Sequence, residues 1–275
     1  MEGGAGAEEV KPFIDHAPQL NAAAVAFKRF GLQTKSCVVT GGTKGIGAAI
    51  VHELASLKAK VVTCSRNAQE LEQAVTEWQQ QGLNVQGCVA DVSTTEGRSH
   101  LIATAKEVFG SKLDILVHNV GTNIRKPTVQ YSDEDYNLVM ATNLESAYKL
   151  SQAAYPLLKA AGSARMILLS SVAGGPTALR SGTIYAMTKA AMNQLTKNLC
   201  CEWGPDGIRV NAVSPWYTLT PLAQQVLQDK EYEAMVLSRT PLKRVAKPDE
   251  VSGGLQFCLH GKPRLTLHGM HPSRK

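Results

Sequence analysis

The chain has 275 residues, of which 44% are hydrophobic and 19% charged, a mixture typical of a globular protein rather than a disordered one. The net charge is +6, but much of the excess lies in residues 259–275, which contain no acid, and aromatic residues are only 5%, so we expect no nucleic-acid partner. No run approaches the roughly 18 consecutive apolar residues of a membrane-spanning helix, so we expect no membrane partner.

The N-terminal segment lacks the pattern of a secretory signal and is too acidic for an ordinary transit peptide. We expect a partly disordered arm over residues 1–34, with a short amphipathic helix over Asn21–Phe30. The six cysteines form no C-x-x-C pair and mostly lie in apolar runs, which favours buried reduced thiols over a metal site or disulfides. These features predict a cytosolic protein without a bound metal, with a plastid as the open alternative.

From Ser36 onward, short β-branched runs alternate with longer helical patterns. This alternation predicts one α/β domain over residues 35–258, a doubly wound Rossmann domain with a parallel sheet of six or seven strands and helices on both faces. The expected strands are Cys37–Thr40, Lys60–Cys64, Val85–Ala90, Leu113–His118, Met166–Ser170 and Ile208–Val213, and the expected helices are about 45–57, 67–81, 95–109, 133–160 and 183–203.

A glycine-rich turn follows the first strand, at Thr40-Gly41-Gly42-Thr43-Lys44-Gly45-Ile46-Gly47. Gly41 lets the chain turn sharply, Gly45 lets the backbone approach a pyrophosphate, and Gly47 lets the next helix pack closely on the sheet. That helix presents free N–H groups and the positive end of its dipole to phosphates. With a strand before it and a helix after it, the turn predicts dinucleotide binding rather than an ordinary tight turn.

The end of the second strand, Thr63-Cys64-Ser65-Arg66-Asn67, has no acid that could bind the ribose 2′-hydroxyl of NAD. Arg66 and Lys44 instead favour a 2′-phosphate, and therefore NADP(H), although Lys44 is the better candidate for a plain surface charge. Asp91 follows the third strand, where it either binds the adenine or caps the next helix.

Tyr185 and Lys189 lie four residues apart in a helical segment and so share a face. The ordinary phenol pKa is about 10. We expect the nearby ammonium to lower the pKa of Tyr185 and make it a general acid for a carbonyl. Hydroxyls at Ser170 and Ser171 end the fifth strand near this helix, and Asn119 and Asn143 are candidates for buried hydrogen bonding.

Together these residues resemble the short-chain dehydrogenase/reductase family over about residues 34–258. The resemblance includes the T-G-x-x-x-G-I-G turn, Tyr185-x-x-x-Lys189, Asn211-x-x-x-Pro215 and Thr220-Pro221. Stretches such as His118-Asn119-Val120-Gly121-Thr122-Asn123 and Pro215-Trp216-Tyr217 are most similar to the plant tropinone-reductase-like branch.

The resemblance implies the following roles. Tyr185 would protonate the substrate carbonyl, Lys189 would lower its pKa and bind the nicotinamide ribose, Ser171 would orient the carbonyl, and Asn143 would hold a relay water. A lid over Trp216 to about Ser238 would carry Leu219, Leu222, Val226, Leu227 and Met235 toward an apolar substrate, unless these residues simply pack within the lid. A homodimer or homotetramer is expected. The implied cofactor contacts are Gly41, Thr43, Lys44, Gly45, Ile46, Gly47, Ser65, Arg66, Asp91, Val92, Asn119, Gly121, Tyr185, Lys189, Pro215 and Thr220.

Three features depart from the family pattern. His118 replaces the usual Asn, and we interpret it as a structural residue at the strand end rather than a catalytic base. Ser171 and Tyr185 are one residue farther apart than is common, which an insertion in the 174–182 loop accommodates. Residues 259–275 form an atypical basic tail, in which Arg264–His268 is a candidate edge strand.

The sequence therefore predicts an NADPH-dependent reductase that converts the ketone of a small, largely apolar substrate to an alcohol. Two alternatives stay open. One is a 3-oxoacyl-carrier-protein reductase, which the nearly neutral body of the chain disfavours. The other is a non-catalytic NADP(H)-binding protein whose altered C-terminus has lost the productive geometry.

Overall fold

A six-stranded parallel sheet forms the centre of the computed structural model, which describes residues 30–175, 177–178 and 182–260. The strand order is β3-β2-β1-β4-β5-β6, so the chain starts in the middle of the sheet and winds outward first one way and then the other. This order confirms the predicted doubly wound Rossmann arrangement. The strands are β1 (Ser36–Thr40), β2 (Lys60–Ser65), β3 (Val85–Val89), β4 (Ile115–His118), β5 (Ala164–Leu169) and β6 (Ile208–Val213).

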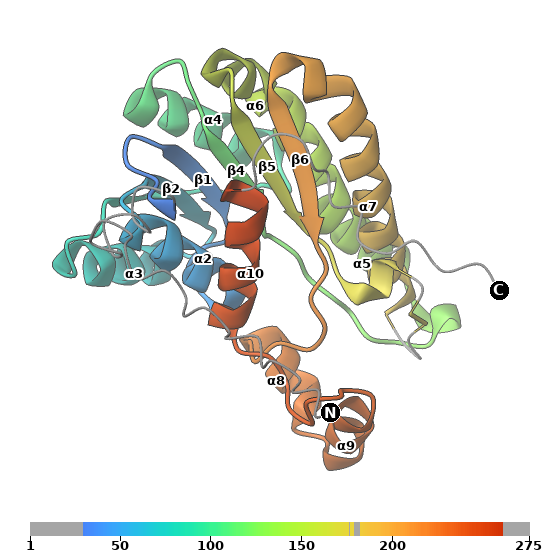
Figure 1. The fold of residues 1–275 in the computed structure, drawn as a ribbon. Coiled ribbons are helices and arrows are strands. Elements are labelled where there is room, and N and C mark those ends of the chain that lie inside the picture. Colours follow the sequence, from blue (N-terminus) through green and yellow to red (C-terminus); the bar gives the residue numbers. More distant parts are fainter. Residues whose placement is uncertain (1–29, 176, 179–181, 261–275) are drawn as a thin grey trace, which may run out of the picture.

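Helices cover both faces of the sheet (Figure 1). On one face lie α4, α6 and α7, and on the other lie α2, α3 and α10, as the membership of the two large apolar clusters shows. The helices are α2 (Gly45–Ser56), α3 (Ala68–Gln80), α4 (Thr95–Phe109), α5 (Asp133–Met140), α6 (Ser146–Ala161), α7 (Thr183–Trp203), α8 (Pro221–Leu227), α9 (Lys230–Ser238) and α10 (Pro248–His260).

The central strands contribute side chains to both apolar clusters, because successive side chains of a strand point to opposite faces of the sheet. Val38 of β1 packs into the cluster under α4, α6 and α7, whereas its neighbours Cys37 and Val39 pack into the cluster under α2, α3 and α10. All three are at most 1% exposed. Burial on both faces explains why these strands read as continuous apolar runs rather than as alternating ones.

The predicted elements agree with the observed ones to within a few residues, with two differences. The pattern over 133–160 is divided, because a π-helical turn at Ala141–Glu145 separates α5 from α6. In addition, the ordered domain extends beyond its predicted end at residue 258, because α10 continues to His260 and Leu259 is buried. The predicted helix over Asn21–Phe30, apart from Phe30, and the candidate strand Arg264–His268 lie outside the described residues.

The segment between β6 and α10 folds as a separate layer beyond the carboxyl ends of the strands (Figure 1). It contains α8 and α9, and it has an apolar cluster of its own built on Tyr217, Leu227 and Val236. We call residues 216–245 the lid. No helix in the described part of the chain has both the length and the hydrophobicity that crossing a membrane requires.

Candidate active site

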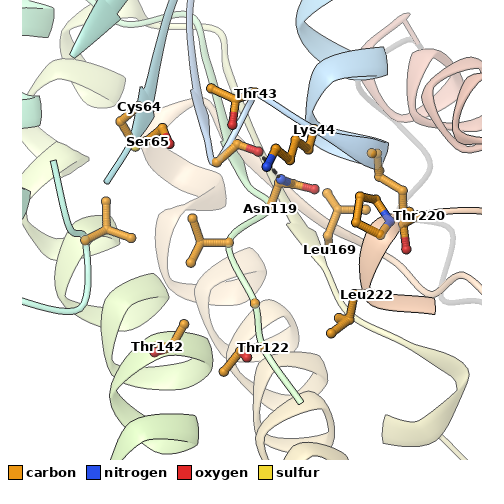
Figure 2. A pocket seen from close by; sticks show the side chains of 18 of the residues that line it. Thr43, Lys44, Cys64, Ser65, Asn119, Thr122, Thr142, Leu169, Thr220 and Leu222 are labelled. Atoms are coloured by element: carbon orange, nitrogen blue, oxygen red, sulfur yellow. Dashed lines mark hydrogen bonds between the residues drawn. The ribbon is translucent and has the colours of Figure 1, made fainter. Parts of the chain in front are cut away.

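A cleft with a volume of about 430 Å³ opens at the carboxyl edge of the sheet. Figure 2 shows Thr43 and Lys44 of the glycine turn on one side of it, Thr122 and Thr142 on the opposite side, and Thr220 and Leu222 of the lid beside them. In doubly wound folds, the carboxyl edge where the strand order reverses is where ligands bind. Here β1 and β4, which meet at that reversal, both end in the cleft.

The glycine turn has the tight geometry expected of a phosphate-binding loop. Gly41 and Gly45 adopt positive φ angles of 67° and 55°, which glycine tolerates and other residues resist. A Cβ on Gly47 would lie 2.1 Å from the Gly41 carbonyl oxygen, so only glycine lets α2 start this close to β1. The N-cap of α3, Asn67, accepts a hydrogen bond from a backbone N–H of its helix, but the N-cap of α2, Lys44, makes no such side-chain bond. The first turn of α2 therefore leaves its N–H groups for a ligand.

Asn119, at the end of β4, holds the shape of this turn. Its side-chain Nδ2 donates to the carbonyl oxygens of Thr40 at 3.0 Å and Gly41 at 2.9 Å. Its backbone N–H donates to the Thr40 hydroxyl at 3.0 Å. Asn119 therefore acts on the cleft through the backbone of the glycine turn.

The corner beyond β2 contains the two cations predicted for a 2′-phosphate. Arg66 is 71% exposed, and its Nη1 lies 3.8 Å from Oδ2 of Asp91. Lys44 forms a closer ion pair, 2.7 Å from Oε1 of Glu70, so its charge is already partly compensated. Asp91 accepts hydrogen bonds from the N–H and hydroxyl of Ser93, whereas the cap of α4 is Thr94, so Asp91 does not cap that helix.

Tyr185 lies in the first turn of α7, with its phenol in the cleft beside Ser171. Burial raises the pKa of Tyr185, and a hydrogen bond with Ser171 and the charge of Arg125 oppose this rise without cancelling it. The expectation that Lys189 lowers the pKa of Tyr185 is wrong for this arrangement, because desolvation of the phenol dominates. A phenol that keeps its proton is suited to donate it to a carbonyl oxygen.

Lys189 is 3% exposed, and its Nζ donates to the carbonyl oxygen of Leu169 at 2.6 Å. The same Nζ lies 5.6 Å from the ring centroid of Tyr185. Burial lowers the pKa of Lys189 to about 8. The carbonyl oxygen of Leu169 fixes the lysine at the end of β5, and among the described residues no carboxylate pairs with it.

Asn143 is fully buried in the π-helical turn and does not line the cleft. Its Oδ1 accepts from the backbone N–H of Thr122 at 2.7 Å, and its Nδ2 donates to the Thr122 carbonyl at 2.9 Å and to the Thr188 hydroxyl at 3.1 Å. Both N–H donors of the amide are thus occupied, and the side chain fastens the loop after β4 to α7. Unusual π-helical turns are frequent at functional sites.

His118 has the structural role expected from the sequence. It is 3% exposed, and its Nε2 lies 2.9 Å from the Ser151 hydroxyl. Burial lowers the pKa of His118 to about 3, so the ring is neutral. Of the cysteines expected to be buried, Cys37, Cys64 and Cys88 are, whereas Cys201 is exposed.

The lid meets the cleft at its base. The Thr220 hydroxyl accepts from the N–H of Ala223 and so caps α8, while the Thr220 side chain lies against Gly45. Of the apolar lid residues proposed to face a substrate, Leu222 lines the cleft. Val226, Leu227 and Met235 pack in the lid's own cluster instead, which is the alternative that the sequence left open.

All sixteen residues predicted to contact a cofactor line the cleft, together with Ser171. Several other lining residues were not predicted from the sequence, among them Ala90, Val120, Thr142 and Leu169, because they belong to no motif that indicates a binding site. Glu70 and Arg125 were not predicted either, and they affect predicted site residues from elsewhere in the chain.

These features define a doubly wound α/β protein with a glycine-rich turn, a tyrosine and a lysine lining one cleft at the carboxyl edge of the sheet. The family profile described as "Enoyl-(Acyl carrier protein) reductase" matches residues 41–262. A tropinone reductase homolog of Arabidopsis thaliana is 52% identical over 240 residues, covering 87% of this chain and 90% of that protein. A chloroplastic tropinone reductase homolog of the same plant is 46% identical over 255 residues, covering 92% of this chain and 79% of that protein.

Solved structures give the same result. A gluconate 5-dehydrogenase from Burkholderia cenocepacia, in complex with NADP and tartrate, superposes with a TM-score of 0.80 at 29% identity, covering 85% of this chain and 91% of that one. A 7α-hydroxysteroid dehydrogenase complexed with NADH superposes with a TM-score of 0.79 at 30% identity, covering 84% and 89%. The chain belongs to the short-chain dehydrogenase/reductase family, and within it the chain is similar to the tropinone reductase homologs.

Proposed function

We propose that this protein is an NADPH-dependent carbonyl reductase that converts the ketone of a small, largely apolar substrate to an alcohol. The observation that carries the proposal is the convergence of Tyr185, Ser171 and Lys189 on one cleft whose other wall is the glycine turn. A proton donor and a dinucleotide cradle in one cavity are what reduction of a carbonyl needs.

The residues of the cleft fit a nicotinamide dinucleotide. The uncapped start of α2 and the close approach at Gly47 suit a pyrophosphate. The exposed Arg66, with no acid at the end of β2, suits a 2′-phosphate and so favours NADPH over NADH. When bound, the reduced nicotinamide supplies the hydride.

The chain's own groups then handle the carbonyl oxygen. Tyr185 Oη and the Ser171 hydroxyl hold it by hydrogen bonds, and the phenol proton moves to it as negative charge develops. Lys189 Nζ, fixed by the carbonyl oxygen of Leu169, places a positive charge 5.6 Å from the centroid of the Tyr185 ring and, because Lys189 lines the cleft, would bind a ribose hydroxyl of the cofactor.

Replacing Tyr185 by Phe tests the role of the phenol. We expect NADPH affinity within a few-fold of the wild type, and reduction of any accepted ketone slowed by about 10²- to 10⁴-fold, the range for loss of a general acid. Tyr136→Phe is the matched control, because that tyrosine is 43% exposed on α5. Full activity in Tyr185→Phe would overturn the assignment. A wild type that binds NADPH and reduces no ketone would favour the non-catalytic alternative.

A further inference from the structure

Arg125 connects the loop after β4 to the lid. Its Nη1 donates to the hydroxyls of Tyr217 at 3.4 Å and Tyr232 at 3.5 Å, and its guanidinium carbon lies 5.8 Å from the Tyr217 ring centroid. The two hydroxyls also hydrogen-bond to each other. Tyr217 is 8% exposed, and Arg125 is half-buried, so this contact is built into the fold rather than made at the open surface.

The charge of Arg125 has no carboxylate partner within 4.0 Å in the described part of the chain. Its neighbour Lys126, by contrast, is paired with Asp135. The Tyr217 hydroxyl, which accepts from Arg125, keeps its proton, since burial raises the pKa of Tyr217 to about 12. Only one of the three guanidinium nitrogens is engaged among the described residues. A half-buried guanidinium held by neutral acceptors is stabilised further by an anion.

Arg125 also lies close to the reaction centre along the chain, because Thr122, three residues before it on the same loop, lines the cleft. Its charge acts on the Tyr185 phenol, where it opposes the effect of burial. Arg125 and Tyr217 do not line the cleft themselves, but Tyr217 follows Pro215, which does, and their contact joins the loop after β4 to the start of the lid. A substrate whose carbonyl oxygen lies at Tyr185 and Ser171 would reach Arg125 by extending toward the lid. A guanidinium presents parallel N–H donors that match the two oxygens of a carboxylate.

We propose that Arg125, with the hydroxyls of Tyr217 and Tyr232, forms a carboxylate-binding subsite, and that the substrate is an oxo acid with an apolar frame between its ketone and its carboxylate. The proposal rests on the carbonyl reductase function above and specifies its substrate class. The carboxylate takes no part in bond changes, and it orients the ketone toward Tyr185.

The test compares oxo acids with their neutral esters. The substrates are 4-oxopentanoate and 5-oxohexanoate, each beside its methyl ester, with NADPH in excess. The wild type is expected to prefer the acids by at least about tenfold in kcat/KM, which corresponds to about 1.4 kcal/mol. Arg125→Gln is expected to lose about 10- to 100-fold on the acids, as for a charge-assisted hydrogen bond, and less than about threefold on the esters.

Two further variants control this comparison. Arg239→Gln removes a guanidinium that belongs to the lid itself and lies 5.8 Å from the Trp216 ring centroid, and it should change the reduction of neither acid nor ester. Arg125→Lys keeps the charge but loses the fork, and should give an intermediate loss on the acids. Thermal unfolding and NADPH affinity check the fold of each variant, and Arg125→Lys serves as the test if the Gln variant unfolds.

Binding of pentanoate and methyl pentanoate to the NADPH complex, measured by calorimetry, separates the two proposals. Equal reduction of acids and esters, unchanged by Arg125→Gln, would overturn the subsite and leave the reductase function standing. Pentanoate binding that requires Arg125, without reduction of any ketone, would overturn the reductase function and leave the subsite. Absence of both reduction and Arg125-dependent binding would overturn both.

Discussion

Gly47 offers a sharp test of how the first turn builds the cofactor cleft. A Cβ at this position would lie 2.1 Å from the Gly41 carbonyl oxygen and 2.4 Å from Nδ2 of Asn119. Real Cβ contacts stay beyond 3.0 Å, so Gly47→Ala must push α2 away from the turn by about an ångström. That movement also separates Asn119 from the Gly41 oxygen that it holds at 2.9 Å.

The magnitude follows from these two effects. Overpacking a tight contact costs about 1–3 kcal/mol, and losing one buried hydrogen bond costs about 0.5–1.5 kcal/mol. For a domain of this size, each kcal/mol lowers Tm by about 2–4 °C. We therefore expect Tm to fall by about 3–18 °C and, because the turn that would hold the pyrophosphate is displaced, NADPH affinity to fall at least about tenfold.

The assay is thermal unfolding with a parallel NADPH titration, and Gly253→Ala is the matched control. Gly253 lies within α10, and a Cβ there meets nothing within 4 Å. Its replacement should stabilise the helix by about 0.5–1 kcal/mol and leave NADPH binding unchanged. If Gly47→Ala matches the wild type in both Tm and NADPH affinity, the steric account of the turn is refuted.

Two further predictions concern charge. Arg66→Ala should weaken NADPH binding by about tenfold while the affinity for NADH changes little. Lys44→Ala should weaken NADPH binding less, because Glu70 already pairs with Lys44. Equal losses of affinity for both cofactors in Arg66→Ala would contradict binding of the 2′-phosphate by Arg66. The pKa of Lys189 is about 8 in the folded protein and about 10.4 in the unfolded chain, so between these pH values the unfolded state binds more protons and stability rises with pH. In chemical unfolding measured from pH 7.5 to 10.5, the free energy of unfolding of the wild type should therefore rise by about 3 kcal/mol relative to that of Lys189→Met. If the two proteins show the same dependence of this free energy on pH, the pKa of Lys189 is not lowered by burial.

The sequence was sufficient for the central strands of the sheet because strands such as β1 and β4 are buried on both faces. The run Cys37–Thr40 reads as apolar throughout, and β1 places its side chains alternately into two cores. The glycine turn could also be predicted from the sequence, since Gly41 and Gly45 adopt positive φ angles that few other residues adopt. The hydrophobic pattern of a strand and the backbone freedom of glycine are local properties, so they were enough to predict these elements.

Other features depend on contacts between distant residues. The pattern over 133–160 gives no sign of the π-helical turn, which accompanies the burial of Asn143 against Thr122 and Thr188. The sign of the pKa shift of Tyr185 required knowing how deeply the phenol is buried. The environment of Arg125 is set by Tyr217 and Tyr232, about a hundred residues later in the chain.

The separate apolar cluster of the lid has a consequence for how this protein can diversify. Tyr217, Leu227 and Val236 pack with lid neighbours, and none of them belongs to the two clusters beneath the sheet. Substitutions in well-separated clusters tend to add independently in their effects on stability. Substitutions in the lid, which the proposed function makes the substrate-facing layer, can therefore accumulate with little effect on the stability of α7 and α2, which pack in the other two clusters.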